Sequence, residues 1–162
     1  MLILGIDPGL NITGYGLIKV KDRCGFSLMD AGFIKTDAQA GMPKRLAKIY
    51  EELFSLLEKT KPDVLVLEKL YAHYKHPVTA SLLGHARGVI CLLAEQKKIH
   101  FVEYSATRVK KVTTGSGHAS KQQIQKMIEY ILDIKKESLK VLDISDAISL
   151  AIAHAYISRF NP

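Results

Sequence analysis

The segment Ile3-Leu4-Gly5-Ile6-Asp7-Pro8-Gly9, close to the start of the chain, decides the fold. Its apolar run predicts a short strand from Leu2 to Asp7, and Pro8-Gly9 favours a turn directly after it. An acidic residue therefore ends a buried strand, at the carboxyl edge where open α/β sheets commonly place ligands. A lone aspartate before Pro-Gly is also a typical turn residue, so Asp7 by itself leaves both interpretations open.

A second acidic residue has the same setting. Val64-Leu65-Val66-Leu67 is a continuous apolar run with β-branched residues, which predicts a buried strand, and Glu68 follows it directly. The coincidence of two such strand ends favours a functional site over two unrelated turns.

Two further acidic residues lie in the last predicted helix. Asp143 and Asp146 are three apart and share a face, in register with Ala147, Leu150 and His154. Carboxylates that face a core are costly unless they are paired or bind a cation, and the sequence places no basic partner nearby. An N-cap role for Asp143 is the alternative. His154 lies roughly 12 Å along the helix axis beyond Asp146 and is interpreted as a packing residue.

The four carboxylates together predict a metal site. Clustered carboxylates repel one another and raise their own pKa values unless divalent cations neutralise them. Hard oxygen ligands select Mg²⁺ or Mn²⁺ over zinc. The sequence therefore predicts a site for two ions, roughly 3.5 to 4 Å apart, of the kind that hydrolyses phosphodiesters. Its catalytic and metal-binding residues are Asp7, Glu68, Asp143 and Asp146.

The whole pattern predicts an α/β fold. We expect three strands in an antiparallel meander, two further strands in the same sheet, and helices on both faces of this five-stranded mixed sheet. No repeat, low-complexity tail or linker divides the 162 residues, so one domain over 1–162 is expected. The expected strands are Leu2 to Asp7, Gly14 to Val20, Phe26 to Thr36, Val64 to Leu67 and Ile99 to Tyr104. The expected helices are Pro43 to Lys59, Val78 to Lys97, Thr107 to Val112, a helix capped by Ser120 that runs to Ile131, and Asp143 to Arg159, with a flexible loop at Thr113 to Gly117.

The charge of the chain points to a polyanionic partner. The formal net charge is +7 and the pI is about 9.4. No acidic residue occurs from Tyr104 to Ile128 or from Lys69 to Ala94, whereas both windows carry basic residues. Such patterning favours nucleic-acid binding over a diffusely solvated lysine face.

The sequence also predicts where the protein works. Cys24 and Cys91 lie far apart and match no zinc-ligand spacing, so reduced thiols in a cytoplasm are expected. The N-terminus lacks the pattern of a signal peptide, and no uninterrupted apolar run approaches the ~20 residues that cross a bilayer. A soluble cytoplasmic protein without a membrane segment is the prediction.

Several motifs occur in an order that resembles the RuvC family of bacterial Holliday-junction resolvases, and they extend over essentially the whole chain. They are Gly5-Ile6-Asp7-Pro8-Gly9 with Thr13-Gly14-Tyr15-Gly16, Glu68-Lys69-Leu70-Tyr71, Gly84-His85-Ala86-Arg87-Gly88, Thr114-Gly115-Ser116-Gly117 with Lys121, and Asp143-Ile144-Ser145-Asp146-Ala147. The resemblance implies a ribonuclease H-like fold and a homodimer that makes paired nicks in a four-way junction and leaves ligatable ends. It also implies the RuvA and RuvB branch-migration machinery as a partner.

The resemblance further implies residues that bind DNA. Lys110 and Lys121 resemble the family's basic residues near the scissile phosphate, and Tyr71 matches an aromatic residue that stacks at the junction centre. Phenylalanine is expected there, so Tyr71 is a departure that adds a hydroxyl. Arg87 and Lys111, in the two basic windows, are predicted to bind DNA as well. The basic and aromatic run from His73 to His76 is either a solvated loop or a DNA contact.

Two alternatives stay open at this point. Asp7-Pro8-Gly9 followed by Thr13-Gly14 also resembles the first phosphate loop of actin-like ATPases and sugar kinases, although no second glycine-rich loop follows. A non-catalytic junction-binding protein that retains the acidic residues is the other. Small residues at Ala80, Gly84 and Gly88 suit either a close dimer contact or ordinary core packing.

Overall fold

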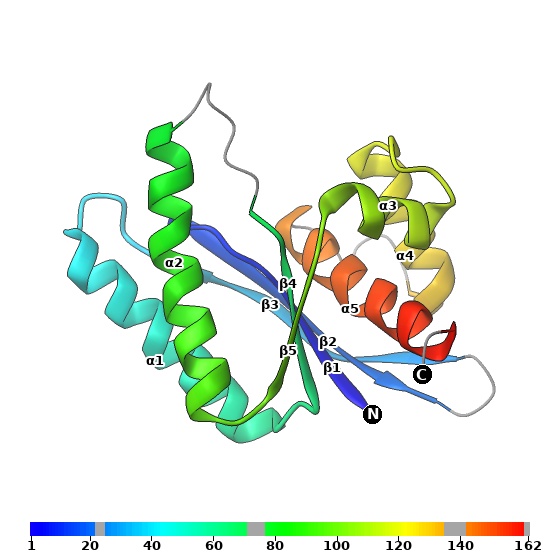
Figure 1. The fold of residues 1–162 in the computed structure, drawn as a ribbon, viewed down its shortest axis with the longest axis horizontal. Helices are drawn as coiled ribbons and strands as arrows, with labels where there is room; N and C mark the ends of the chain where they lie inside the picture. Colours follow the sequence, from blue (N-terminus) through cyan, green and yellow to red (C-terminus); the bar gives the residue numbers. More distant parts are fainter. Residues whose placement is uncertain (22–24, 71–76, 135–141, 161–162) are drawn as a thin grey trace.

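The computed structural model describes residues 1–21, 25–70, 77–134 and 142–160, and at positions 77, 142, 143 and 160 it describes the backbone alone. Strands and helices follow one another along the chain in the order that Figure 1 shows. The strands are β1 (Leu2–Asp7), β2 (Ile12–Val20), β3 (Phe26–Lys35), β4 (Val64–Glu68) and β5 (His100–Tyr104). The helices are α1 (Met42–Thr60), α2 (Pro77–Gln96), α3 (Ala106–Thr114), α4 (Lys121–Leu132) and α5 (Leu142–Phe160).

The five strands form one mixed sheet in the order β3-β2-β1-β4-β5. β1, β2 and β3 pair antiparallel as consecutive neighbours, whereas β4 and β5 add on the other side of β1 as parallel strands. The carboxyl ends of β1, β4 and β5 therefore meet at one edge of the sheet. The predicted meander and the predicted five-stranded mixed sheet are both confirmed.

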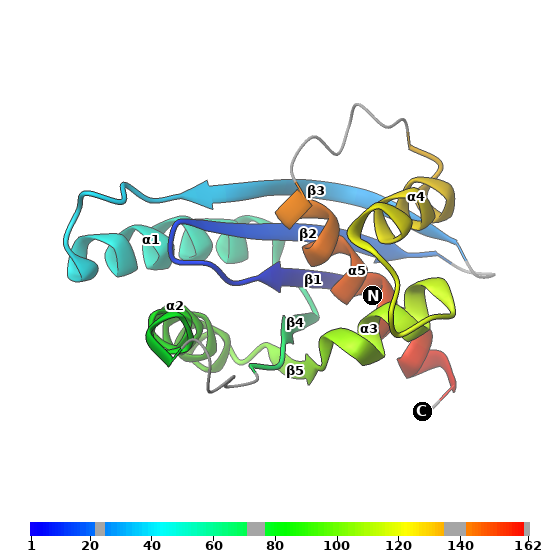
Figure 2. The same ribbon diagram turned by 90° about the horizontal axis from the view of Figure 1, so that it is seen from above.

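Helices cover both faces of the sheet (Figures 1 and 2). α1 and α2 pack on one face, where Leu4, Ile6, Leu65 and Leu67 of the strands point. α5 packs on the other face, with α3 and α4 outside it. Each strand thus alternates its side chains between two separate cores, as a sheet buried on both faces requires.

α5 lies closer to the sheet than an ordinary helix. The nearest atom to an ideal Cβ built on Gly5 of β1 would be the carbonyl oxygen of Ala147, at 2.0 Å. A Cβ on Gly16 of β2 would lie 2.4 Å from the side chain of Ile148. Residues 147–155 of α5 are buried all round, which explains why the helix has apolar residues on every side. Two glycines therefore fix how near α5 comes to β1 and β2.

Element ends differ from the predicted ones by one or two residues, and three of these differences have consequences. α3 continues to Thr114 and ends at Gly115, whose φ of 83° stops the helix, so the predicted flexible loop from Thr113 is too long. α5 already includes Leu142, so Asp143 is a helical residue and its N-cap alternative is wrong. β2 also begins earlier than expected, because Ile12 and Thr13 still pair with β3.

One helix in the described part of the chain, α2 over Val78–Gln96, is long and apolar enough to cross a membrane by length and composition alone. The uninterrupted apolar runs of the sequence are shorter, because Thr79, His85 and Arg87 interrupt this helix. A single helix of this kind is weak evidence for insertion, and α2 packs Ala86, Ile90 and Leu93 onto the sheet. The exposed side of α2 also carries apolar residues, namely Val78, Leu82 and Leu92.

Candidate active site

Asp7 and Glu68 lie side by side at the carboxyl edge of the sheet. Their strands are parallel neighbours whose pairing ends with Ile6 opposite Leu67, and each acidic residue comes directly after that pair. Neighbouring strands are about 4.8 Å apart. The structure therefore brings together the two strand ends that the sequence singled out.

Both carboxylates point to the face that α5 covers. Ile6 and Leu67 belong to the core under α1 and α2, whereas Val66 belongs to the core under α5. Because side chains alternate along a strand, Asp7 and Glu68 are directed to the α5 side.

Asp146 reaches the same place from α5. It directly precedes Ala147, whose carbonyl oxygen is the group closest to Gly5 of β1. Its Oδ2 forms an ion pair with Nζ of Lys121 at 2.8 Å. Sequence reasoning found no basic partner near Asp146, and this was wrong in space because Lys121 begins α4, 25 residues earlier in the chain.

The charges around Glu68 show how close these groups are. Burial raises the pKa of Glu68, and the negative charge of Asp146 raises it further. The positive charges of Lys110, Lys121 and Arg87 act in the opposite direction. A carboxylate with a raised pKa is unfavourable in its ionised form, and a bound cation would relieve that cost.

The remaining predicted ligand is described only in part. Asp143 lies one helical turn before Asp146 in α5, and its side chain is outside the described residues. Among the side chains that the structure describes, no three His, Cys, Asp or Glu groups form a complete metal site. The donors present are all carboxylate oxygens, which suit a hard divalent cation. Metal binding by Asp7, Glu68, Asp143 and Asp146 stays a prediction.

A hollow of about 350 Å³ opens between the strand ends and α2. Asp7 and Glu68 supply its acidic groups, and Lys69 and Arg87 supply its basic ones. Its other lining residues are Pro8, Leu70, Leu83 and Ala106. The hollow therefore reaches the strand ends that carry the two acidic residues.

The predicted lysines lie on α3 and α4, and both helices have well-formed N-termini. Ser105 caps α3, and Ser120 with Gln123 forms a capping box that starts α4 at Lys121. Lys121 contacts Asp146, and the charge of Lys110 acts on Glu68, so both belong to the carboxylate cluster. Lys111 is exposed on α3, and its predicted role in DNA binding stays a prediction.

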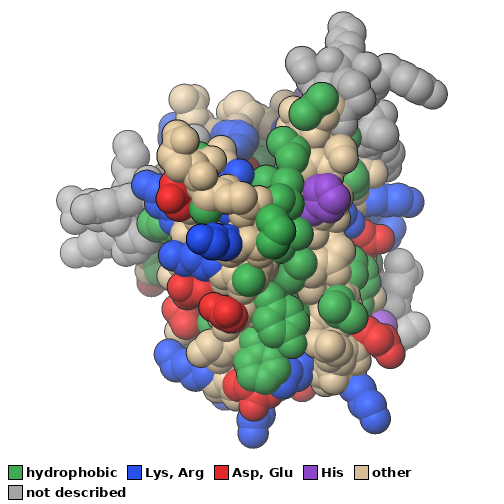
Figure 3. Space-filling model, turned by 90° about the vertical axis from the view of Figure 1, so that its left-hand side faces the viewer, with side chains coloured by type: hydrophobic (Ala, Val, Ile, Leu, Met, Phe, Trp, Pro, Cys, Tyr) green, Lys and Arg blue, Asp and Glu red, His purple; other side chains and the backbone are tan. Residues whose placement is uncertain are grey.

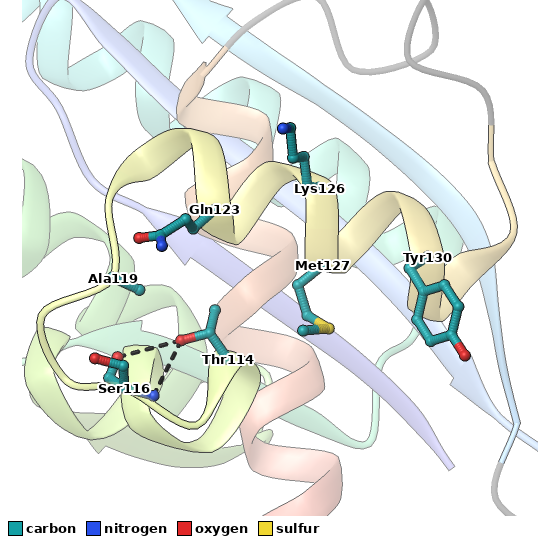
Figure 4. A pocket seen from close by; sticks show the side chains of 7 residues that line it. All are labelled: Thr114, Ser116, Ala119, Gln123, Lys126, Met127 and Tyr130. Atoms are coloured by element: carbon teal, nitrogen blue, oxygen red, sulfur yellow. Dashed lines mark hydrogen bonds between the residues drawn. The ribbon is translucent and has the colours of Figure 1, made fainter.

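The loop between α3 and α4 is held by its own hydroxyls, as Figure 4 shows. Oγ1 of Thr114 accepts a hydrogen bond from the Ser116 backbone N–H at 3.3 Å and donates to the Lys110 carbonyl oxygen at 2.8 Å. Beside the loop, α4 borders a second hollow of about 350 Å³. Its lining residues are Thr114, Ser116, Ala119, Gln123, Lys126, Met127 and Tyr130.

Arg87 links α2 to the end of β4. Its Nη1 donates to the backbone carbonyl oxygen of Glu68, and its Nη2 forms an ion pair with Oε1 of Glu103 on β5. Sequence reasoning missed Glu103, since an acidic residue in a short edge strand gives no signal of a partner on a helix. DNA binding by Arg87 stays a prediction, and the contacts described are both within the protein.

His154 is a packing residue, as predicted. It is buried, and its Nδ1 lies 2.9 Å from the hydroxyl of Tyr104. Burial lowers the pKa of His154, and the charge of His100 lowers it further. The neutral imidazole therefore belongs to the core between α5 and β5.

The model of one protein family, described as crossover junction endodeoxyribonuclease RuvC, matches residues 3–154. This chain belongs to the RuvC family. A relative of that name from Rhodopirellula baltica is 41% identical over 160 residues, which cover 99% of this chain and 88% of the relative. Another from Ehrlichia ruminantium (strain Welgevonden) is 44% identical over 158 residues, with 96% and 97% covered.

A solved structure is similar over the same length. RuvC of Thermus thermophilus in complex with a Holliday junction substrate has a TM-score of 0.89 and 26% identity, covering 99% of this chain and 96% of that one. The ribonuclease H-like fold expected from the RuvC resemblance is thereby confirmed.

Two of the sequence-based predictions lie outside the described residues. They are the stacking role of Tyr71, which the family resemblance implies, and the choice between a solvated loop and a DNA contact for the run from His73 to His76. The structure describes the chain up to Leu70 and again from position 77, and so leaves both as predictions.

Proposed function

We propose that this RuvC-family chain is a crossover junction endodeoxyribonuclease that resolves four-way (Holliday) DNA junctions during recombination and repair. One observation carries the proposal: Asp7, Glu68 and Asp146 converge from β1, β4 and α5, with Lys110 and Lys121 beside them. The junction bound by the Thermus thermophilus protein supports the choice of substrate.

The four carboxylates would hold two divalent cations, Mg²⁺ with Mn²⁺ as a substitute. Asp7, Glu68 and Asp146 supply oxygen donors from three elements, and Asp143 would add a fourth from its place in α5. Such ions, when bound, supply the charge that activates a water molecule and stabilises the departing oxygen of a phosphodiester.

The lysines would hold the substrate at this site. Lys110 and Lys121 carry positive charge next to the carboxylates, where a DNA phosphate would otherwise be repelled. They would fix the scissile phosphate against the strand ends.

Paired nicks need two sites, and we propose that they come from a homodimer. Figure 3 shows hydrophobic side chains gathered in a stripe over the side of the molecule formed by α1 and α2. We call this set the α2 stripe: Val78, Leu82 and Leu92 of α2 are 71%, 36% and 53% exposed, and Phe54 of α1 is 37% exposed. Exposed apolar patches of this kind mark interaction sites, and a second copy of the chain would cover this one.

The setting proposed for the enzyme follows from the family. The RuvA and RuvB branch-migration complex is the partner that would deliver the junction, and the cytoplasm is the compartment. Cys91 is a free cysteine, which is compatible with a reducing compartment.

Incubation with synthetic four-way junctions and matched linear duplexes tests the proposal. We expect symmetric nicks in the junction alone, only when Mg²⁺ or Mn²⁺ is present. Cleavage of both substrates at equal rates, or cleavage in excess chelator, would contradict it. Junction binding without any cleavage would instead favour the non-catalytic alternative.

A further inference from the structure

Arg87 is the only arginine that the described structure places beside the carboxylate cluster, and it approaches from the opposite face of the sheet. It lies on α2, whereas the side chain of Glu68 faces α5. Its guanidinium holds two groups at once, the carbonyl oxygen of Glu68 and the carboxylate of Glu103. The fixed fork of an arginine suits such a two-point contact, which a lysine cannot reproduce.

The contact between Arg87 and the Glu68 carbonyl oxygen lies where the hydrogen-bonded pairing of β4 with β5 ends. The last backbone hydrogen bond beside it runs from the Lys69 N–H to the Tyr104 carbonyl oxygen, at 2.8 Å. Beyond that bond β4 has ended, and in the described part of the chain Leu70 adds no further strand pairing. The hydrogen bond that Arg87 donates to the Glu68 carbonyl oxygen therefore restrains the backbone that carries the Glu68 side chain.

We propose that Arg87 is a positioning residue: oriented by Glu103, it fixes the end of β4 so that the Glu68 carboxylate faces Asp7 and Asp146. This inference rests on the proposed function of Glu68. It differs from the sequence-based expectation that Arg87 binds DNA.

The environment of Arg87 supports this role over a DNA contact. Its side chain is only 11% exposed, and both described contacts are to protein. A side chain that contacts DNA phosphates has to be exposed to solvent, as that of Lys111 is. Partners that orient a ligating carboxylate typically change metal affinity or activity by about 10- to 100-fold when they are removed.

Arg87→Gln and Lys111→Gln form a matched pair, because each removes one positive charge from a residue that the sequence predicted to bind DNA. In metal-free buffer we expect Arg87→Gln to keep the junction affinity and salt dependence of the wild type, whereas Lys111→Gln should lower the salt slope by about one. With Mn²⁺ as the probe, titration followed by electron paramagnetic resonance should show about 10- to 100-fold weaker binding to Arg87→Gln and unchanged binding to Lys111→Gln.

Amide hydrogen exchange provides a readout that needs neither metal nor DNA. In Arg87→Gln the Lys69 amide should exchange at least about 10-fold faster, while the Val66 amide in the middle of β4 keeps its protection. Glu103→Gln should also speed up exchange of the Lys69 amide and weaken Mn²⁺ binding, but by less, because Arg87 still donates its hydrogen bond to the Glu68 carbonyl oxygen. If Arg87→Gln does not fold, the Lys69 exchange rate and the Mn²⁺ affinity of Arg87→Lys and Glu103→Gln test the proposal in its place.

The inference is overturned if folded variants keep the exchange rate of Lys69 and the Mn²⁺ affinity of the wild type, or if Arg87→Gln loses salt slope as Lys111→Gln does. Failure of the proposed function looks different, because the wild type itself would then leave junctions uncut. The exchange of Lys69 would still report on Arg87 in that case.

Discussion

Glu68 ends β4 partly buried, with the carboxylate of Asp146 near enough to act on it. Burial first, and Asp146 second, raise the pKa of Glu68 above its ordinary value of 4.5. A carboxyl group whose pKa is higher in the folded state binds its proton more tightly there. Its ionisation therefore lowers stability as the pH rises from about 4.5 through the folded-state value.

We accordingly expect metal-free Glu68→Gln to melt at a higher temperature than the wild type at neutral pH, and the difference to vanish below about pH 4. Thermal melting in chelator across pH measures this. Glu58→Gln is the control of opposite sign, because the Lys97 hydrogen bond and charge lower the pKa of Glu58. A Glu68→Gln protein that is less stable than the wild type at neutral pH would contradict the expectation.

Asp146 gives a second expectation for single residues. Asp146→Asn should bind junctions in chelator at least as tightly as the wild type, because it removes a negative charge and releases Lys121 from its 2.8 Å ion pair. It should lose cleavage by at least the roughly 10- to 100-fold typical of lost metal-site support. Gel-shift and nicking assays on one junction measure the two effects. Unchanged nicking would remove Asp146 from the site.

The residues that the sequence predicted best are those with a local signal. Asp7 and Glu68 follow unbroken apolar strands, and that pattern alone places them at a sheet edge. The Lys121 partner of Asp146 and the Glu103 partner of Arg87 have no such signal. Each pair joins two elements whose relative placement depends on packing of the whole sheet.

Among the elements, α5 is the one whose position depends most on the absence of a side chain at a single residue, Gly5 of β1. Gly5→Ala would place its Cβ 2.0 Å from the Ala147 carbonyl oxygen, so either β1 or α5 has to move. Overpacking of this kind costs about 1 to 3 kcal/mol or more. We expect a corresponding loss in urea denaturation, together with weaker cleavage because Asp146 moves with α5.

Gly88→Ala is the matched control in α2. A Cβ there has no atom within 4 Å outside its own helix, so the added methyl group meets open space. Alanine in a helix is favoured over glycine by about 1 kcal/mol, and the variant should be more stable than the wild type. Equal stability of the two alanine variants would mean that α5 is not tightly seated on β1.

Helix and strand identities could be predicted along the chain because their periodicity is strong, and their ends could be predicted to within a residue or two. The closeness of α5 to β1 could not be predicted. A glycine in an apolar run suggests a close approach but does not name what approaches, and here the neighbour is 142 positions away in the sequence.

For the whole molecule, the α2 stripe predicts association. Val78→Asp puts a charge on the most exposed residue of the stripe, near the helix N-terminus where an acidic side chain does not disturb folding. We expect analytical ultracentrifugation to show at least about 10-fold weaker dimerisation, which corresponds to roughly 1.4 kcal/mol. Junction cleavage should then yield single nicks more often than paired ones.

Met29→Asp is the control for this change. Met29 is 53% exposed on β3, which is the edge strand opposite β5, and Met29→Asp should dimerise as the wild type does. Dissociation caused by Met29→Asp and not by Val78→Asp would place the contact on the β3 edge of the sheet.

The position of α5 in the chain also has a consequence for synthesis. A ribosome completes all the strands and the other four helices that the structure describes before it makes α5. The α5-facing core of β1 and β2 is covered only once that helix has been made. A nascent chain that stops short of α5 therefore exposes an apolar sheet face and lacks both helical carboxylates. Chaperones and proteases would bind such a fragment, which has no nuclease activity. Only chains that have been translated through α5 would therefore cut DNA in the cell.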